Sequence, residues 1–137
     1  MNPHPARVLI VDDEQEIRLF VSRVLQRGGY EVTTAASGQD AMAMTPELGA
    51  IDLLITDELM PRMAGHQLAR TLRGREPGLR VLYLTGFSDQ LFKEKRALWA
   101  DEAFLDKPCT AQGLLEAVSL LLFGDLSAAA RVNRAEL

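Results

Sequence analysis

The sequence predicts an α/β fold of three layers, with a parallel β-sheet between two layers of helices. Short apolar runs alternate regularly with amphipathic stretches along the chain of 137 residues. Five such strand–helix pairs imply a parallel sheet that is covered on both faces. The apolar runs lack the alternation of polar and apolar residues that a half-exposed strand shows, so both sides of the strands are expected to be buried.

Five apolar segments are predicted to be the strands. Most are rich in β-branched and aromatic residues, and they cover residues 7–11, 30–35, 51–56, 81–85 and 103–106. The first and the third end abruptly in acidic residues. The segment 30–35 is the weakest of the five, and Glu76-Pro77-Gly78 is a predicted turn before the fourth.

Five amphipathic segments are predicted to be helices, at residues 14–28, 37–44, 66–73, 89–99 and 110–123. The pair Gly28-Gly29 should terminate the first helix, because glycine commonly follows a helix end. Ser37 and Thr110 are the predicted N-caps of the second and last helices, and Pro46 is expected just past the end of the second. The last helix carries a predicted core stripe of Leu114, Leu115, Val118, Leu121 and Leu122.

Length and composition indicate one globular domain with two short flanking segments. The chain is 47% apolar and 25% charged, which is ordinary for a soluble protein. Residues 1–6 are expected to be an N-terminal arm, 7–123 the folded domain, and 124–137 a C-terminal extension that is helical or disordered. The net charge of -4 argues against direct binding to nucleic acid.

The sequence also indicates the cellular compartment. No apolar run approaches the roughly 20 residues that cross a bilayer, and the first residues do not resemble a signal peptide. Cys109 is the single cysteine and cannot form an internal disulfide. We therefore expect a cytoplasmic protein that does not contact the membrane.

Polar side chains mark four of the predicted strands at the point where each strand ends. Asp12 and Asp13 follow the first strand, Asp57 follows the third, Thr85 ends the fourth and Lys107 follows the fifth. In open parallel sheets, ligands bind outside the carboxyl ends of the strands. We therefore expect these five residues to form one site.

The residue types of this site suit metal-dependent phosphoryl transfer. Three crowded carboxylates raise one another's pKa unless a cation lies among them, and a site of oxygen ligands suits Mg²⁺. Asp57, on the central strand, is the best placed nucleophile for an aspartyl phosphate. Lys107 supplies a compact positive charge for a phosphoryl oxygen, and the Thr85 hydroxyl can donate to another. The two histidines, His4 and His66, are expected to be surface residues rather than ligands.

Four separated motifs carry a family resemblance: Val11-Asp12-Asp13-Glu14, Asp57-Glu58-Leu59-Met60-Pro61 with Gly65, Thr85-Gly86, and Lys107-Pro108. Over roughly residues 7–123, the chain resembles the receiver domain of two-component response regulators. The resemblance implies a flavodoxin-like, doubly wound fold, in which a five-stranded parallel sheet of order 2-1-3-4-5 is flanked by five helices.

The same resemblance implies a role for each site residue. Asp57 would accept a phosphoryl group from the histidine of a sensor histidine kinase or of a histidine phosphotransfer protein. Asp13, Asp57 and the backbone carbonyl of Leu59 would bind Mg²⁺ directly, and Asp12 would assist through water. Lys107 would contact the phosphoryl group. Such a domain catalyses only its own phosphorylation and dephosphorylation, so no other enzymatic activity is expected.

The resemblance also implies a switch that changes binding to a downstream protein target. Thr85 would move toward the phosphoryl group, Phe104 would occupy the aromatic switch position of the family, and the Lys107-Pro108 peptide bond would be cis. The protein is expected to act as a monomer or weak homodimer and to have no fused output domain.

Two departures from the family pattern bear on the lifetime of the phosphoryl group. Leu59 lies two residues after the expected acceptor Asp57, and Phe87 lies two residues after the expected switch residue Thr85. Neither apolar side chain can orient an attacking water molecule. We therefore hypothesise that self-dephosphorylation is slow and that the phosphodonor docks on an apolar surface.

Other functions fit the sequence less well. A phosphatase of the haloacid dehalogenase type, which also uses an aspartyl nucleophile, needs a second Asp two residues further on, where this chain has Leu59. A non-phosphorylated pseudo-receiver that only binds partners would normally have lost one of the five site residues, and none is lost. A dinucleotide-binding enzyme is disfavoured because no G-x-G-x-x-G follows the first strand.

Overall fold

Five parallel strands form one sheet in the order β2-β1-β3-β4-β5. The computed structural model describes residues 5–86 and 101–124 of the chain. The strands are β1 (Arg7–Val11), β2 (Glu31–Ala35), β3 (Leu53–Thr56), β4 (Arg80–Thr85) and β5 (Glu102–Asp106). The helices within these residues are α1 (Gln15–Arg27), α2 (Gly38–Leu48), α3 (Gly65–Arg75) and α5 (Ala111–Phe123). The predicted fold class and strand order are confirmed, and the predicted helix at 89–99 lies outside the described residues.

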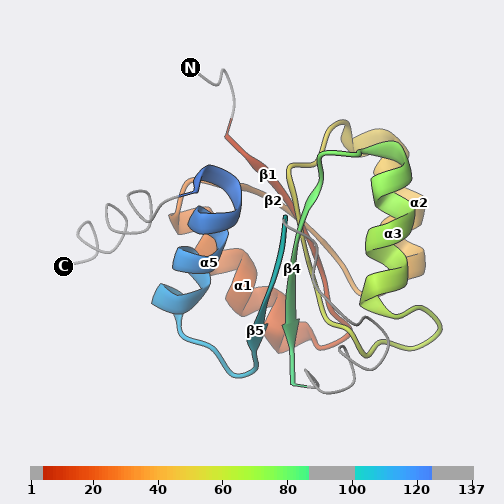
Figure 1. Cartoon of the computed structure of the whole chain (residues 1–137). Helices are drawn as coiled ribbons and strands as arrows, with labels where there is room; N and C mark the ends of the chain where they lie inside the picture. The colour runs from red at the N-terminus through yellow and green to blue at the C-terminus, as the bar shows by residue number, and fades with distance from the viewer. Residues whose placement is uncertain (1–4, 87–100, 125–137) are drawn as a thin grey trace.

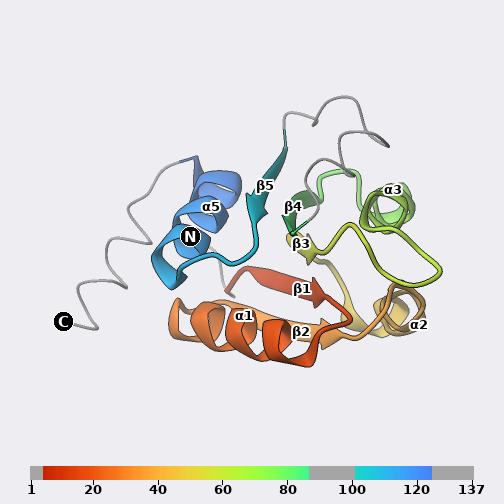
Figure 2. The ribbon, with the colours of Figure 1, turned by 90° about the horizontal axis from the view of Figure 1, so that it is seen from below.

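Helices cover both faces of the sheet (Figures 1 and 2). α1 and α5 lie on one face, and α2 and α3 lie on the other. Successive residues of β1 point to opposite faces: Val8 and Ile10 belong to the apolar cluster beneath α1 and α5, and Leu9 and Val11 to the cluster beneath α2 and α3. None of the four is more than 2% exposed. Burial on both faces explains why this strand is apolar throughout.

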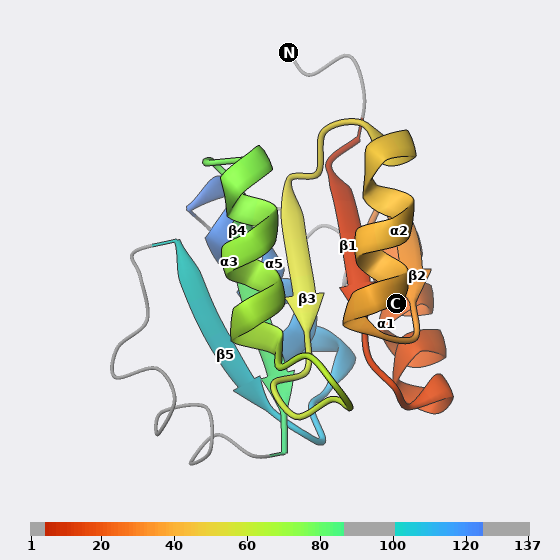
Figure 3. The ribbon, with the colours of Figure 1, turned by 90° about the vertical axis from the view of Figure 1, so that its right-hand side faces the viewer.

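The carboxyl ends of all five strands meet along one edge of the sheet (Figure 3), because every pair of neighbours is parallel. Val11, the last residue of β1, pairs with Ala35 of β2 and Thr56 of β3. Thr85, the last residue of β4, pairs with Asp106 of β5. The residues that follow these strands are therefore brought to the same edge.

The ends of the helices follow local sequence signals. The Ser37 and Thr110 side chains each accept a hydrogen bond from the backbone N–H three residues further on, at 3.0 and 2.9 Å, so both predicted N-caps are confirmed. α1 ends just before the pair Gly28-Gly29, as predicted. Gly29 has a φ of 88°, a conformation that glycine adopts without strain.

The prediction for the second helix was too short. α2 continues through Pro46 to Leu48, whereas the sequence indicated that the helix would end before this proline. A proline inside a helix leaves the carbonyl four residues earlier without its N–H partner. Here that carbonyl belongs to Met42, and the Thr45 hydroxyl donates to it at 3.1 Å. This side-chain hydrogen bond replaces the missing one and lets the helix continue.

α5 closes the core on its side of the sheet. Leu114, Leu115 and Val118 are buried, and Leu121 and Leu122 are partly buried against the same apolar cluster, so the predicted core stripe is confirmed. None of the helices in residues 5–86 and 101–124 has the length and apolar character that a membrane span requires.

Candidate functional site

Three aspartates lie together at the carboxyl edge of the sheet. Asp12 and Asp13 follow β1, and Asp57 follows β3, which is the neighbour of β1 in the sheet. One carboxylate oxygen from each residue lies within 4.8 Å of the others. Asp12 and Asp57 are only 2% and 4% exposed, whereas Asp13 is exposed. The cluster is therefore accessible from solvent on the side of Asp13.

Lys107 reaches the acidic cluster from the segment after β5. Its Nζ lies 2.8 Å from Asp12 Oδ2 and 3.1 Å from Asp57 Oδ2, and it donates to Glu14 Oε1 at 3.1 Å. Burial lowers the pKa of Lys107, but the hydrogen bonds and charges of the three carboxylates raise it by more, so the pKa lies above its ordinary value. Lys107 is thus a fixed positive charge in the site. Its peptide bond to Pro108 is cis, as the family resemblance implied.

The positive charge of a single lysine does not fully offset the negative charge of the buried carboxylates. Burial raises the pKa of Asp12, and the charge of Asp57 adds to this effect, against the lowering by Lys107 and by the Glu14 N–H. Asp57 Oδ1 is buried and accepts no hydrogen bond from the described residues. A hard divalent cation would favour the ionised carboxylates and would give this oxygen a partner. The oxygen-only donor set therefore fits Mg²⁺.

The turn between β1 and α1 is held by hydrogen bonds to Asp12. The Arg18 guanidinium, from α1, donates to the Asp12 carbonyl at 2.6 Å. The Asp12 carboxylate in turn accepts from the Glu14 N–H at 2.9 Å. Sequence reasoning did not identify Arg18, because an arginine near the start of an amphipathic helix carries no pattern that names its partner.

The main chain at Asp57 is also fixed. Its N–H donates to the Val11 carbonyl at 3.2 Å, and its carbonyl accepts from the Thr56 hydroxyl at 2.9 Å. Gly65, the first residue of α3, packs so closely against this carbonyl that a Cβ at Gly65 would overlap it. Glycine at this position therefore lets α3 begin directly beside Asp57.

Three other predicted site residues, Thr85, Leu59 and Phe104, are among the described residues. Thr85 is buried at the end of β4, which is the neighbour of β3. Leu59, two residues after Asp57, is 39% exposed, and Phe104 of β5 is 37% exposed. Phe87 lies outside the described residues. The roles of these residues in metal binding, switching and phosphate lifetime stay predictions.

His66 is not the surface residue that the sequence indicated. Its side chain is only 14% exposed, and its Nδ1–H donates to Glu58 Oε2 at 2.6 Å. The His66 backbone N–H donates to Glu58 Oε1 at 2.9 Å. A glutamate two residues after the buried third strand was the available signal, because a buried charged side chain requires a hydrogen-bonding partner. His4 lies outside the described residues.

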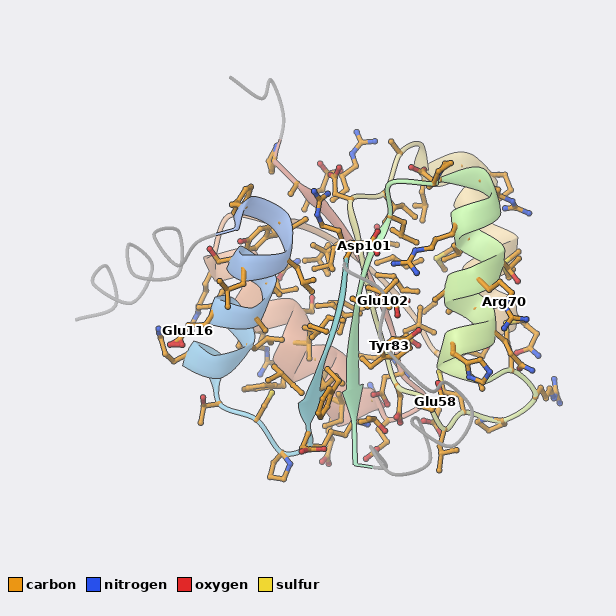
Figure 4. The ribbon with its side chains drawn as sticks, viewed as in Figure 1. Glu58, Arg70, Tyr83, Asp101, Glu102 and Glu116 are labelled. Carbon is orange, nitrogen blue, oxygen red and sulfur yellow. The ribbon has the colours of Figure 1, made fainter. Side chains whose placement is uncertain are left out.

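A second polar cluster lies near the amino end of β5, where Arg73, Tyr83 and Glu102 are buried and Asp101 is partly exposed. Arg73 of α3 donates to Glu102 at 2.6 Å and to Asp101 at 2.9 Å, and the Tyr83 hydroxyl donates to Glu102 at 3.5 Å. Burial, and then the charges of Glu102 and Glu58, raise the pKa of Tyr83. Figure 4 shows Tyr83, Glu102 and Asp101 one after another along β4 and β5, with Glu58 beyond Tyr83 toward the start of α3. Sequence periodicity did not indicate this cluster, because its members come from three different elements.

The fold and the acidic site together define a class of protein. A sequence profile described as the response regulator receiver domain matches residues 8–119. The chain therefore belongs to the receiver domain family of two-component response regulators.

Relatives of this chain occur as separate receivers and as parts of larger proteins. The sensor kinase CckA of Brucella abortus (strain 2308) is 36% identical over 118 residues, which are 85% of this chain and 12% of the kinase. The response regulator receiver protein CpdR of the same organism is 30% identical over 116 residues, which are 85% of this chain and 96% of CpdR. The chain thus spans almost all of CpdR but a small part of CckA.

Solved receiver structures share the fold. The receiver domain from the hybrid histidine kinase CckA superposes with a TM-score of 0.71 at 33% identity, over 85% of this chain and 99% of that one. CheY4 of Vibrio cholerae gives a TM-score of 0.75 at 36% identity, over 86% and 99%. The response regulator TrrA from Thermotoga maritima, in complex with Mg²⁺-BeF, gives 0.73 at 32% identity, over 85% and 99%.

Proposed function

We propose that this chain accepts a phosphoryl group on Asp57 from the phosphohistidine of a sensor histidine kinase or of a histidine phosphotransfer protein. The observation that carries the proposal is the hydrogen bonding of the two oxygens of the buried Asp57 carboxylate. Its Oδ2 accepts from Lys107 at 3.1 Å, and its Oδ1 has no hydrogen-bond partner among the described residues. A buried carboxylate held in this way can act as a nucleophile once the surrounding negative charge is neutralised.

In the proposed reaction, a carboxylate oxygen of Asp57 attacks the phosphorus of the phosphohistidine. The new O–P bond replaces the P–N bond, whose electron pair returns to the imidazole nitrogen of the donor. Lys107 offsets the negative charge on the phosphoryl oxygens, and the Thr85 hydroxyl donates to one of them.

Mg²⁺ is the proposed cofactor of this site. We assign Asp13, Asp57 and the Leu59 carbonyl as the groups that hold the ion, with Asp12 assisting through water. When bound, the ion would neutralise the charge that develops during phosphoryl transfer.

The phosphoryl group would act as a switch for binding to a downstream protein target. It adds roughly -1.5 to -2 charge units, and it can shift a conformational equilibrium only through contacts that differ between two states. We propose Thr85 and Phe104 as the residues that change position. Because Phe104 is 37% exposed on β5, its movement would alter the surface of β5 and α5. In this proposal, residues 7–123 form a cytoplasmic receiver, flanked by residues 1–6 and 124–137, that is a monomer or weak homodimer.

Phosphorylation by acetyl phosphate, followed by the mass of the intact protein, tests the proposal. We expect the wild-type protein to gain one phosphoryl group with Mg²⁺ and almost none without it. Asp57→Asn should gain none, because its amide cannot form an acyl phosphate. Asp40→Asn, a matched change at an exposed aspartate in the first turn of α2, should behave as wild type. Labelling of Asp57→Asn at the wild-type rate would contradict the assignment, and an unlabelled wild-type protein would favour the pseudo-receiver.

A further inference from the structure

Glu58 ties the end of β3 to the start of α3. It directly follows Asp57, and its partner His66 is the second residue of α3. The Glu58 carbonyl accepts from the Gly65 N–H at 2.9 Å. Its carboxylate accepts from the His66 backbone N–H at 2.9 Å and from the His66 Nδ1–H at 2.6 Å. These three hydrogen bonds close the loop of residues 59–64 at both of its ends.

The hydrogen bonds of this pair are shielded from water. The Glu58 side chain is 1% exposed and that of His66 is 14% exposed. Hydrogen bonds to an ionised acceptor are shorter and stronger than neutral ones, and a low local dielectric strengthens them further. The carboxylate also meets the positive end of the α3 dipole. The pair therefore holds β3 and α3 together more strongly than an exposed ion pair, which contributes little to stability.

The position of Glu58 in the chain connects this pair to the acidic site. Glu58 lies between Asp57 and Leu59, the two neighbours that the proposed function assigns to Mg²⁺. Further along the same loop, Arg62 has a φ of 73°, which is unfavourable for a residue other than glycine. The loop thus holds a shape that its local backbone preferences do not favour, and the hydrogen bonds at its ends help to impose that shape.

We propose that Glu58 and His66 are positioning residues that hold Asp57 and the Leu59 carbonyl in place for Mg²⁺. The inference rests on the proposed function, because it requires the metal to bind at this edge of the sheet. Neither side chain is assigned to the metal or to the phosphoryl group. Groups behind metal ligands commonly set the affinity by orienting the ligands, and their loss typically weakens binding 10–100-fold.

Mg²⁺ binding to the full chain, measured by isothermal titration calorimetry, tests the inference. His66→Leu keeps a side chain of similar bulk but removes the Nδ1–H donor, so the Kd for Mg²⁺ should rise about tenfold. His66→Asn retains a side-chain N–H close to the position of Nδ1, so its Kd should stay near that of wild type. Arg70→Leu is the control, because it also introduces a leucine into α3, one turn further along and at an exposed residue. It should leave the Kd unchanged.

Thermal unfolding of the metal-free proteins shows whether each variant is folded. A folded His66→Leu with weakened Mg²⁺ binding, together with rescue in His66→Asn, supports the positioning role. If His66→Leu does not fold, Glu58→Gln, which keeps the backbone hydrogen bond to Gly65, replaces it with the same expected rise in Kd. Equal Kd values in wild type and in these variants would overturn this inference alone. A wild-type protein that binds no Mg²⁺ would overturn the proposed function and the inference with it.

Discussion

Leu59 bears on the predicted lifetime of a phosphoryl group on Asp57. It lies two residues after Asp57, is 39% exposed, and has no polar atom in its side chain. A side chain of this type cannot accept a hydrogen bond from water or donate one to it. Hydrolysis of an aspartyl phosphate would therefore proceed without a water molecule positioned by this residue.

Leu59→Asn should shorten the lifetime of the phosphorylated protein about tenfold, because the amide can orient an attacking water molecule. The measurement is the decay of phosphoprotein after the phosphodonor is removed, with Mg²⁺ present. Leu59→Met, which keeps an apolar side chain of similar size, should decay as slowly as wild type. A rapid wild-type decay that Leu59→Asn leaves unchanged would contradict the hypothesis of slow self-dephosphorylation.

Individual site residues differ in how far the sequence alone predicted them. Asp12, Asp57 and Lys107 were predicted to lie together, because each follows a strand and parallel strands bring such positions to one edge. The pairing of His66 with Glu58 was not predicted, because the two residues are eight positions apart on either side of a loop whose path is set by the packing of α3. The spacing of residues within one element is periodic, whereas contacts across a loop are not.

At the scale of the elements, Arg73 joins α3 to the amino-terminal ends of β4 and β5, which are neighbours in the sheet. Its guanidinium bonds to the Leu79 carbonyl at 3.1 Å, before β4, and to Asp101 and Glu102 at the start of β5. The side chains of Arg73 and Glu102 are 8% and 1% exposed. Removing one partner of a buried pair is costly, because the other charge stays in a poor solvent. Tyr83 of β4 lies against this pair, so its ionisation would add a second buried negative charge beside Glu102.

The raised pKa of Tyr83 predicts a loss of stability in alkali. Above the ordinary tyrosine pKa of 10.0, the unfolded chain releases this proton while the native protein keeps it. The native state then binds more protons, so the free energy of unfolding falls as pH rises. Between about pH 9 and about pH 11, the free energy of unfolding should fall by about 1.4 kcal/mol more in wild type than in Tyr83→Phe.

Urea unfolding followed by circular dichroism across this pH range measures the difference. Tyr83→Phe should change stability little near neutral pH, because the hydroxyl makes a hydrogen bond of only 3.5 Å to Glu102. Parallel losses of stability in the two proteins would show that Tyr83 ionises at an ordinary pKa.

The boundaries of elements were predicted less well than their existence. The sequence pattern indicated all five strands, but β3 begins at Leu53 rather than at residue 51. The Ile51 N–H donates to the Glu76 side chain at 3.1 Å instead of pairing in the sheet. α2 continues past Pro46 because of the Thr45 hydroxyl. In both places a side-chain hydrogen bond decides the boundary, and the sequence pattern does not indicate such a bond.

At the scale of the whole molecule, the acidic site and the apolar core have opposite effects on stability. The core buries both faces of the sheet, whereas the site holds the largely buried Asp12 and Asp57 beside Asp13 with Lys107 as their shared cation. Crowded carboxylates disfavour one another's ionised form. The metal-free fold should therefore be less stable than the same fold with one of these charges removed, as is common where function competes with stability.

Asp57→Asn should raise the free energy of unfolding of the metal-free protein by roughly 1 kcal/mol, since it removes one repelling charge while Lys107 keeps Asp12 and Glu14 as partners. Mg²⁺ should reduce or reverse this difference in stability between wild type and Asp57→Asn. An ion that binds only the native state, present at ten times its Kd, adds about 1.4 kcal/mol to the free energy of unfolding of the wild-type protein. It should add much less to that of Asp57→Asn, which has lost a ligand charge. Denaturant unfolding with and without Mg²⁺ measures the free energy of unfolding of wild type and of Asp57→Asn in both conditions. The control Asp40→Asn should have the same values as wild type. Equal stabilisation of wild type and Asp57→Asn by Mg²⁺ would mean that the ion binds elsewhere on the protein.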